Sequence, residues 1–506
     1  MGAPDFRCAV PGLQNDTFRV QDDAHSRWVN AAIPYDADKG TYSQCSHYKS
    51  NSDLSTWYLG QGHEQTENVS SREKQKCSRW VYSTDVFASS IISELDLVCD
   101  RELYISHANM MSMFGLMIGS LFSGTFSDIF GRKKTFLFFF WFQMIVAFCT
   151  VFATSIPALL ISRALVSGTG LAFYMSIFVL SPRKRVKAAI CSQFGWVLGM
   201  LVLLLLAYLF RDWRHLQLAL SFPLIPIAIG YFWLIPESPR WLLNKGRYSE
   251  AQAILTKIAK VNKNELPEKF FLQDLGDNPR KTKDEFDEAN TRRDPQRRSL
   301  MLLIKSPILA VRLAILSFCW IVCSMVYYGV TLNIGTIIEG DIYTNFLIMA
   351  ILELAAYCII PITLKYVGRK VFYCACVLVG GGACLATIVP LLIGTDQEWI
   401  NMCLSNLGRL SIAGAFAIIW LYTSELLPTP ARQSGIGFCS FTGRLGGIVS
   451  PYIATLDTLV DGSVGKTLPL LVFGAAAVVA GLLSLLLPET GKRKLPETVE
   501  EAENMK

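Results

Sequence analysis

Gly131-Arg132-Lys133 and Gly368-Arg369-Lys370 each stand where one long apolar run ends and the next begins. Eleven apolar runs occupy residues 103–487, and each has about the 20 mostly apolar residues that a membrane-spanning helix requires. They fall near 104–126, 136–153, 156–180, 188–209, 214–235, 308–331, 341–363, 371–393, 398–422, 435–456 and 468–487. Because the same corner follows two of the runs, the sequence predicts an all-α polytopic membrane protein built from two related halves.

The composition and the basic residues agree with this topology. Hydrophobic residues make up 52% of the 506-residue chain and charged residues 17%, which is more apolar than an ordinary soluble domain. Lys and Arg in short loops stay on the cytoplasmic side of a membrane. When the runs are counted in order, all the basic loops fall on one side, so we expect the C-terminus inside and the polar segment 1–102 outside.

The segment 1–102 has further features of an extracellular region. Its two N-glycosylation sequons begin at Asn15 and Asn68, and together they are harder to attribute to chance than either one alone. Because polar residues directly follow Met1, we expect no cleaved signal peptide and a first run that acts as a reversed anchor. Disulfides are expected among the four cysteines of this segment, with their pairing left open. These are Cys8, Cys45, Cys77 and Cys99.

Three features recur in the same order in the two halves. The first half contains Gly131-Arg132, Arg163 and Pro236-Glu237-Ser238, and the second contains Gly368-Arg369, Arg409 and Pro488-Glu489-Thr490. Repeated halves joined by a long connector are typical of secondary transporters. We therefore predict an extracellular segment, an N-terminal membrane half, a basic cytoplasmic connector, a C-terminal membrane half and a cytoplasmic tail, at 1–102, 103–235, 236–305, 306–487 and 488–506.

Several motifs resemble those of the major facilitator superfamily. The stretch 124–133, Gly-Thr-Phe-Ser-Asp-Ile-Phe-Gly-Arg-Lys, resembles its cytoplasmic loop signature, and 236–242 is similar to the sugar-porter and organic-ion branches. Cys99-Asp100, Tyr327-Tyr328-Gly329 and 422–429 favour the organic cation, anion and zwitterion transporters of the solute carriers. This resemblance covers nearly the whole chain, and it implies a carrier that moves small organic ions by alternating access.

Two charged residues lie inside predicted spans, where charge is unfavourable and is usually functional. Glu353 lies in Leu352-Glu353-Leu354 and Arg444 in Gly443-Arg444-Leu445. An Arg offers a carboxylate or sulfate a fork of donors, and a Glu holds an ammonium group or a proton. Alternatively, these two charges neutralise each other or a neighbouring charge. The resemblance implies a basic residue at the position of Arg444 in anion and carnitine carriers, so Arg444 favours anions or zwitterions.

Aromatic and polar residues at similar depth extend the predicted substrate site. The resemblance places Trp196, Gln193, Tyr327 and Tyr328 in the cavity wall, with Tyr174 as a weaker candidate. Aromatic faces attract quaternary or protonated amines. The competing interpretation is ordinary helix packing, which accounts for most aromatic residues in a chain with 30 Phe.

The cytoplasmic motifs predict a gate. Asp128 can lie against the positive end of a neighbouring helix, and Arg132 can bind carboxylates or lipid phosphates. Glu425 and Arg432 flank the corresponding loop of the second half. We expect these four residues to latch the two halves together in one state of the cycle. A simple anchor of positive charge on the inner side is the alternative.

Other activities lack residues to support them. Gly465-Lys466-Thr467 ends like a phosphate-binding loop, but Val460 stands where its first Gly is required. The spacing of the five His fits no metal site, and no nucleophile elbow or paired carboxylates can be placed. We therefore expect no enzyme, cofactor, metal, nucleotide or nucleic acid. The expected partners are a small organic ion and the lipid bilayer of the plasma membrane, with the oligomeric state undetermined.

Two departures from the family keep three hypotheses open. A first helix ahead of the extracellular segment and a Glu ahead of Pro182 are both missing from the pattern. The first hypothesis is a working carrier of organic anions or zwitterions. The second is a cation carrier in which Glu353 and the aromatic residues receive the substrate and Arg444 is paired internally. The third is a truncated form that does not transport.

Overall fold

The structure is a computed structural model, and it describes most of the chain. The described residues are 4–36, 41–49, 73–176, 182–263, 301, 303–332, 341–393, 398–428, 431–458, 463–491, 496 and 498–505. The chain divides into two compact units. One comprises residues 1–105, 154–156 and 207–219, and the other comprises 106–153, 157–206 and 220–506.

The first unit is a small domain of short strands and helices. Its strands form three antiparallel pairs, which are β1 (Phe6–Cys8) with β6 (Trp80–Tyr82), β2 (Tyr35–Asp36) with β3 (Thr41–Tyr42), and β4 (Ser46–Tyr48) with β5 (Lys74–Lys76). Its helical elements are α1 (Asp23–Ala32), α3 (Ile91–Glu94) and the 3₁₀ turn η2 (Cys99–Arg101). Two-stranded sheets this short bury little apolar surface, and covalent links supplement them.

Two disulfides and one buried ion pair hold this unit together. Cys8 is bonded to Cys77, and Cys45 to Cys99. Arg7 donates to the Asp16 carboxylate at 2.6 and 3.1 Å, and both side chains are almost fully buried. The backbone N–H of Val10 and the His25 ring lie 2.7 and 2.9 Å from the same carboxylate. Asp16 therefore joins β1 and the residues just after it to α1.

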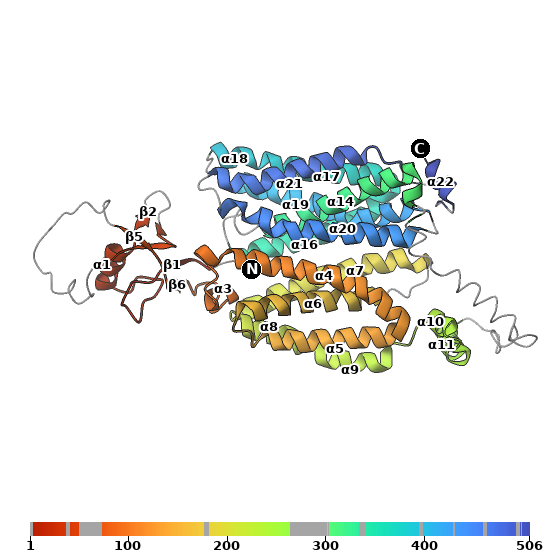
Figure 1. The fold of residues 1–506 in the computed structure, drawn as a ribbon, viewed down its shortest axis with the longest axis horizontal. Coiled ribbons are helices and arrows are strands. Elements are labelled where there is room, and N and C mark those ends of the chain that lie inside the picture. The colour runs from red at the N-terminus through yellow and green to blue at the C-terminus, as the bar shows by residue number, and fades with distance from the viewer. Residues whose placement is uncertain are drawn as a thin grey trace, which may run out of the picture. The chain divides into compact units, whose positions relative to one another are not determined.

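The second unit contains the long helices, which lie side by side in a bundle (Figure 1). The N-terminal half contributes α4 (Leu103–Phe130), α5 (Arg132–Thr150), α6 (Ile156–Ser176), α7 (Pro182–Leu209), α8 (Trp213–Ser221) and α9 (Leu224–Leu234). Most of α8, the first residues of α4, the first residue of α6 and the last residues of α7 belong to the first unit. α10 (Pro239–Asn244) and α11 (Tyr248–Val261) follow as a short hairpin. The C-terminal half consists of α14 (Pro307–Leu332), α16 (Ile342–Tyr366), α17 (Arg369–Ala386), α18 (Ile388–Ile393), α19 (Glu398–Leu426), α20 (Arg432–Ala454), η3 (Thr455–Thr458), α21 (Ser463–Ser484) and α22 (Val499–Glu503).

The helices follow the eleven apolar runs, with two interruptions. The run 214–235 is broken between α8 and α9 at Phe222-Pro223, because proline cannot continue the hydrogen-bond ladder of α8. The run 371–393 is broken at Thr387, between α17 and α18. Among the described residues, eight helices are long and apolar enough to span a membrane. The fold is thus a polytopic helical membrane protein, and the count of eleven spans remains a prediction.

The two repeated corners have the same construction. In the first half, the Glu237 carboxylate accepts hydrogen bonds from the backbone N–H groups of Arg132 and Lys133, at 2.8 and 3.1 Å. In the second half, Glu489 accepts from the N–H groups of Arg369 and Lys370, also at 2.8 and 3.1 Å. Each carboxylate thus satisfies free donors at a helix start and meets the positive end of the helix dipole.

Close approach explains the glycine at each corner. A Cβ on Gly131 would lie 2.5 Å from Oε2 of Glu237, and Gly131 has a φ of +99°. A Cβ on Gly368 would lie 2.2 Å from Oε2 of Glu489. Only glycine leaves room for the capping carboxylate, and the repeated Gly-Arg and Pro-Glu motifs are therefore the two parts of one contact.

We predict that Gly131→Ala lowers the thermal stability of the purified chain. A side chain at this positive φ adds about 1–3 kcal/mol of backbone strain, and the new methyl group displaces the Glu237 cap. The control is Gly230→Ala in α9, where the nearest atom to a new Cβ is Cδ1 of Leu234 at 3.9 Å. Equal unfolding temperatures for both variants would contradict this account of the corner.

We also predict that the first unit loses stability below the ordinary pKa of aspartate. Burial alone would raise the pKa of Asp16, but hydrogen bonds from Arg7, Val10 and His25 and the charge of Arg7 hold it below 3.8. A depressed folded-state pKa gives stabilisation that is complete above the unfolded value and is lost as the pH falls through the folded value. Amide-exchange protection of residues 4–36 should fall in that range. Asp16→Asn, which keeps the Asn15 sequon, should lower amide protection at neutral pH and remove this acid dependence. If the pH profile of protection is the same in Asp16→Asn as in the wild type, Asp16 is not the cause of the acid dependence.

Candidate functional site

Glu353 is the centre of a buried polar network in the C-terminal half. It lies on α16, and its side chain is 1% exposed. Tyr327 of α14 and Tyr357 of α16 donate their hydroxyl hydrogens to its Oε1 at 2.8 and 2.7 Å. Nη2 of Arg409, on α19, lies 3.4 Å from its Oε2. Three helices therefore converge on one carboxylate.

Arg409 is as deeply buried as its partner. Its side chain is 6% exposed, and its Nη1 donates to the Thr331 hydroxyl. Its guanidinium carbon lies 5.3 Å from the ring centre of Tyr327, which is within cation–π distance. Its Nε has no hydrogen-bond partner among the described residues. Glu353 is thus neutralised by a charge on a neighbouring helix, which was one of the two outcomes that the sequence left open.

Aromatic rings extend this network on the side of Tyr327. The Tyr327 ring stacks on Phe416, and the half-buried ring of Tyr328 meets it edge to face, each with centroids 5.3 Å apart. Trp320, one of the largest fully buried side chains, donates its indole N–H to Thr423 at 2.9 Å. Tyr327 therefore serves both as a donor to Glu353 and as part of an aromatic wall.

Arg444 is in a different situation. It lies on α20 and is half-buried, and none of the described side chains forms an ion pair or hydrogen bond with it. On the same helix, a Cβ on Gly443 would lie 3.2 Å from Trp320, and one on Gly446 would lie 2.1 Å from the Ile321 carbonyl oxygen. The face of α20 with these glycines packs tightly on α14, and this contact fixes the position of the helix that carries Arg444. The structure does not bring Arg444 and Glu353 together as a pair.

The predicted wall residues of the N-terminal half lie on α7 in an open setting. Trp196 is 55% exposed, and Gln193 is half-buried. A Cβ added at Gly195 or Gly199 would meet no described atom within 4 Å. The face of α7 that carries Gly195 and Gly199 therefore has no described neighbour, whereas Val197 and Met200 of the same helix are buried. The side chain of Tyr174 lies outside the described residues.

The four predicted gate residues make contacts of a different kind. The Asp128 side chain lies outside the described residues, and the backbone of Arg132 binds Glu237 as described above. Glu425 accepts a hydrogen bond from Thr490 at 2.6 Å and lies 3.4 Å from the Arg369 guanidinium. Arg432 donates to the carbonyl oxygen of Leu427, near the C-terminus of α19. Each of these contacts lies within one half, so a latch between the halves remains a prediction.

Contacts between the halves lie toward the ends that the sequence predicts to be extracellular. Ser106, near the start of α4, donates to the Pro451 carbonyl oxygen at 3.3 Å. The next residue, His107, has its Nδ1 2.8 Å from the Tyr452 hydroxyl. Deeper in the bundle, Met200 of α7 packs against Met349 and Ala350 of α16. Among the described residues, these contacts join the two halves toward that end.

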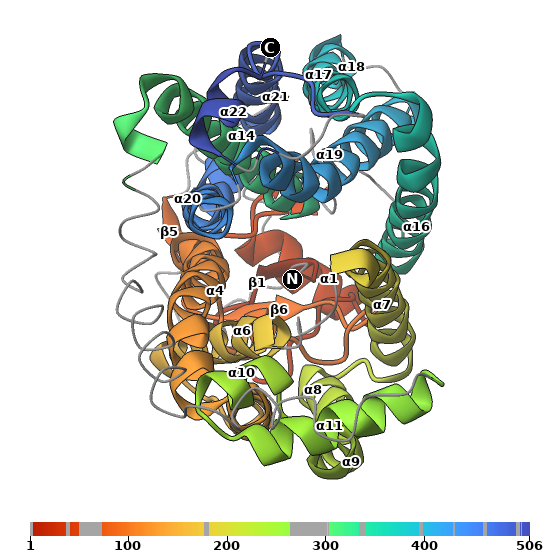
Figure 2. The same cartoon turned by 90° about the vertical axis from the view of Figure 1, so that its right-hand side faces the viewer.

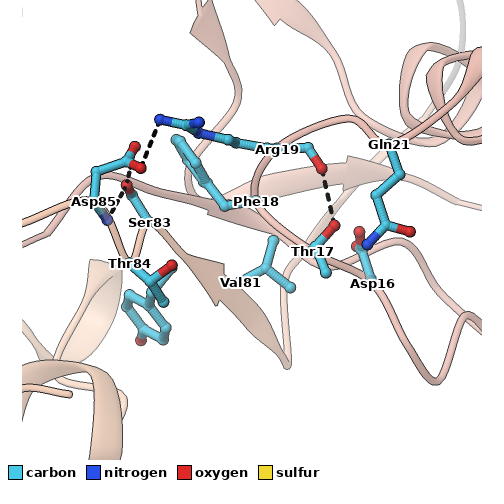
Figure 3. Close-up of a pocket in the computed structure, with 10 residues that line it drawn as sticks. Asp16, Thr17, Phe18, Arg19, Gln21, Val81, Ser83, Thr84 and Asp85 are labelled. Atoms are coloured by element: carbon cyan, nitrogen blue, oxygen red, sulfur yellow. Dashed lines mark hydrogen bonds and ion pairs between the residues drawn. The ribbon is translucent and has the colours of Figure 1, made fainter. Parts of the chain in front are cut away.

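The first unit contains a hollow of about 400 Å³, lined by residues 16–19, 21 and 81–85 (Figure 3). Arg19 and Asp85 face each other there in an ion pair of 2.6 Å. Asp16 is already held by Arg7 and His25. Because these charges are paired, the hollow offers an organic ion no free charge. Asn15, next to it in sequence, is exposed in a turn and accessible to a glycan, whereas Asn68 lies outside the described residues.

We predict that Glu353 and Arg409 are energetically coupled. Removing one partner of a buried pair leaves an unpaired charge and costs about 3–5 kcal/mol. Glu353→Met and Arg409→Met should therefore each lower the unfolding temperature strongly, and the double variant should recover part of the loss. Additive losses in thermal unfolding would show that the two side chains do not form the pair.

Comparisons with known proteins agree on the fold and the family. The sequence pattern of the family described as "Sugar (and other) transporter" matches residues 55–502. The fold is similar to that of the xylose transporter XylE from E. coli in an inward-open conformation, with a TM-score of 0.59. The match covers 79% of this chain and 88% of XylE, and the sequences are 16% identical. At this identity the likeness concerns the fold alone.

Curated relatives match along the whole chain. The "Organic cation transporter protein" of Drosophila melanogaster is 32% identical over 509 residues, which is 100% of this chain and 87% of that protein. "Solute carrier family 22 member 2" of Homo sapiens is 32% identical, covering 99% of this chain and 88% of the relative. "Organic cation/carnitine transporter 2" of Homo sapiens is 29% identical, covering 99% and 86%. The chain therefore belongs to the sugar and other transporter family of the major facilitator superfamily, in the branch of the organic cation and carnitine transporters.

Proposed function

We propose that this chain carries small organic anions or zwitterions, such as carnitine-like compounds, across the membrane by alternating access. Secondary-active and facilitative transport are both compatible with the proposal. Support comes from the family and from relatives named as organic cation and carnitine transporters. The observation that carries the choice of substrate is the contrast between two membrane-embedded charges, because Glu353 is neutralised by Arg409 whereas Arg444 has no described partner.

Charge balance explains why this contrast favours an acidic group on the substrate. The paired carboxylate and guanidinium carry no net charge. Hydrogen bonds with Tyr327, Tyr357 and Thr331 use much of their remaining hydrogen-bonding capacity. A half-buried guanidinium without a counterion is unfavourable in a low-dielectric setting. A carboxylate or sulfate on the substrate would supply the missing negative charge through two parallel hydrogen bonds. The aromatic face of Trp196 and the amide of Gln193 would then contact the rest of the substrate.

The Glu353 network has a positioning role in this mechanism. It fastens α14, α16 and α19 to one another through Tyr327 and Arg409. Such a connection lets the C-terminal half move as one body while the interface between the halves opens and closes. Ser106 and His107 contact α20 near the predicted extracellular end. Alternating access would require these contacts to break.

A cation carrier is the second candidate, favoured by the names of several relatives. In this case Glu353 and the rings of Tyr327, Tyr328 and Phe416 receive an ammonium group, and Arg409 must release Glu353 during the cycle. The two candidates differ in which residue the substrate needs. Glu353→Gln would abolish uptake of a quaternary ammonium in a cation carrier, and Arg444→Ala would spare it.

We also propose that the protein acts in the plasma membrane, after passing through the secretory route with a glycan on Asn15. The supporting observations are the exposed position of Asn15 and the two disulfides of the extracellular unit. Glycans that never mature, on a protein found only in intracellular membranes, would contradict this location.

We predict that Arg444→Ala reduces uptake of labelled carnitine and of a sulfated steroid by roughly tenfold to a hundredfold, the loss of one charge-assisted contact. Uptake is measured in cells with surface expression confirmed, and a quaternary ammonium completes the panel. Arg444→Lys should keep part of the activity because it keeps the charge. The control is Arg27→Ala, at an exposed position of α1.

Each outcome decides between the hypotheses. Loss of carnitine or sulfate uptake in Arg444→Ala but not in Arg27→Ala supports the proposed substrate class. Quaternary ammonium uptake that survives Arg444→Ala and is lost in Glu353→Gln supports the cation carrier. No uptake by well-expressed wild-type protein contradicts both carriers and favours a form that does not transport.

A further inference from the structure

The hairpin of α10 and α11 carries a concentration of unmatched positive charge. Residues 239–263 contain six basic side chains and one acidic side chain, Glu250. Arg247 donates to Glu250 at 2.7 Å, so the only acid of the hairpin is already paired. Lys257, Lys260 and Lys263 are exposed, and no described acidic side chain forms an ion pair with them. The outer face of α11 therefore has free positive charge.

An exposed apolar stripe runs beside these lysines. Ile254, Ile258 and Val261 lie at positions i, i+4 and i+7, which places them on one side of α11. Val261 is 77% exposed and Ile258 is 42% exposed, whereas Ala251, one turn before Ile254, and Ala259 are buried. Burying such a stripe in water-excluded surroundings would be favourable. Lysines flanking an exposed apolar stripe are typical of helices that lie at a membrane interface.

The position and direction of the hairpin place it at that interface. Trp233 and Leu234, at the end of α9, are 78% and 74% exposed, and tryptophan is enriched where a membrane helix meets the headgroup layer. Pro239 begins α10 only a few residues later. α11 is seen end-on where the bundle helices are seen lengthwise (Figure 1), and lengthwise where they are seen end-on (Figure 2). Its axis is therefore roughly parallel to the plane of the membrane.

We propose that α11 binds the anionic headgroups of the cytoplasmic leaflet. Lys257 and Lys260 contact lipid phosphate or carboxylate groups, and the stripe of Ile254, Ile258 and Val261 lies at the boundary with the acyl chains. Anionic lipid fits because it matches both the charge and the apolar stripe, whereas nucleic acid would match only the charge. This inference depends on the predicted inside position of the connector and not on the transported substrate.

Hydrogen–deuterium exchange of the full chain in nanodiscs tests this proposal without a reporter group. One set of discs contains phosphatidylcholine alone, and the other also contains phosphatidylserine, with a single chain in each disc. We expect the amides of residues 248–263 to exchange several-fold more slowly with phosphatidylserine, and high salt should reverse the effect. The amides of α17, inside the bundle, serve as the reference and should not respond.

Two variants separate charge from apolar contact. Each lysine near an anionic surface strengthens attachment about fivefold, so Lys257→Glu with Lys260→Glu should abolish the phosphatidylserine effect. The matched control, Lys74→Glu with Lys76→Glu in the extracellular unit, changes the net charge equally and should leave the effect intact. Val261→Asp should weaken the slowing of exchange in the presence of phosphatidylserine.

The same experiment can overturn the proposal. Equal exchange of residues 248–263 in both kinds of disc would show that α11 does not bind anionic lipid. Slowing that appears only when two chains share a disc would assign the surface to a second copy of the protein. Slowing that survives the charge reversal at Lys257 and Lys260 would also contradict the proposed contact.

Discussion

A buried carboxylate without water must be paired, and in this protein Glu353 meets that requirement through three side chains from its own half. Tyr327, Tyr357 and Arg409 surround it within hydrogen-bonding or ion-pair distance. The consequence is both structural and functional. Three helices are fixed to one another, and the charge of Glu353 is balanced before any substrate arrives. Because Glu353 is already balanced by Arg409, it does not compensate the charge of Arg444, which has no described partner.

The same principle operates at the repeated Gly-Arg-Lys corners of the two halves. The free N–H groups at the starts of α5 and α17 are satisfied by Glu237 and Glu489, each from the loop that ends its half. In the second half this contact is extended, because Glu425 also approaches Arg369 and Thr490. No Glu stands ahead of Pro182 in the first half. The repeat therefore conserves the helix cap but not the additional ion pair.

The sequence predicted the helices and the repeat well because both depend on local patterns. Apolar runs locate the spans, and Gly-Arg and Pro-Glu recur in a fixed order. Two helix breaks were missed, although Pro223 was a visible signal for one of them. Glu353 was recognised as unusual because charge is rare in such a run, but its partner Arg409 was noted only as a repeat marker. Pairing across 56 positions depends on how helices pack, which periodicity does not report. The pairing of the four cysteines was left open for the same reason.

The central claim is that this chain exchanges small organic ions across a membrane. It is tested most directly by reconstituting the full chain in liposomes and measuring the entry of labelled carnitine with and without unlabelled carnitine inside. An alternating-access carrier returns faster when it is loaded, so the account predicts that preloading accelerates entry. Entry no faster than in protein-free liposomes, whether or not they are preloaded with carnitine or with a quaternary ammonium, would contradict the account.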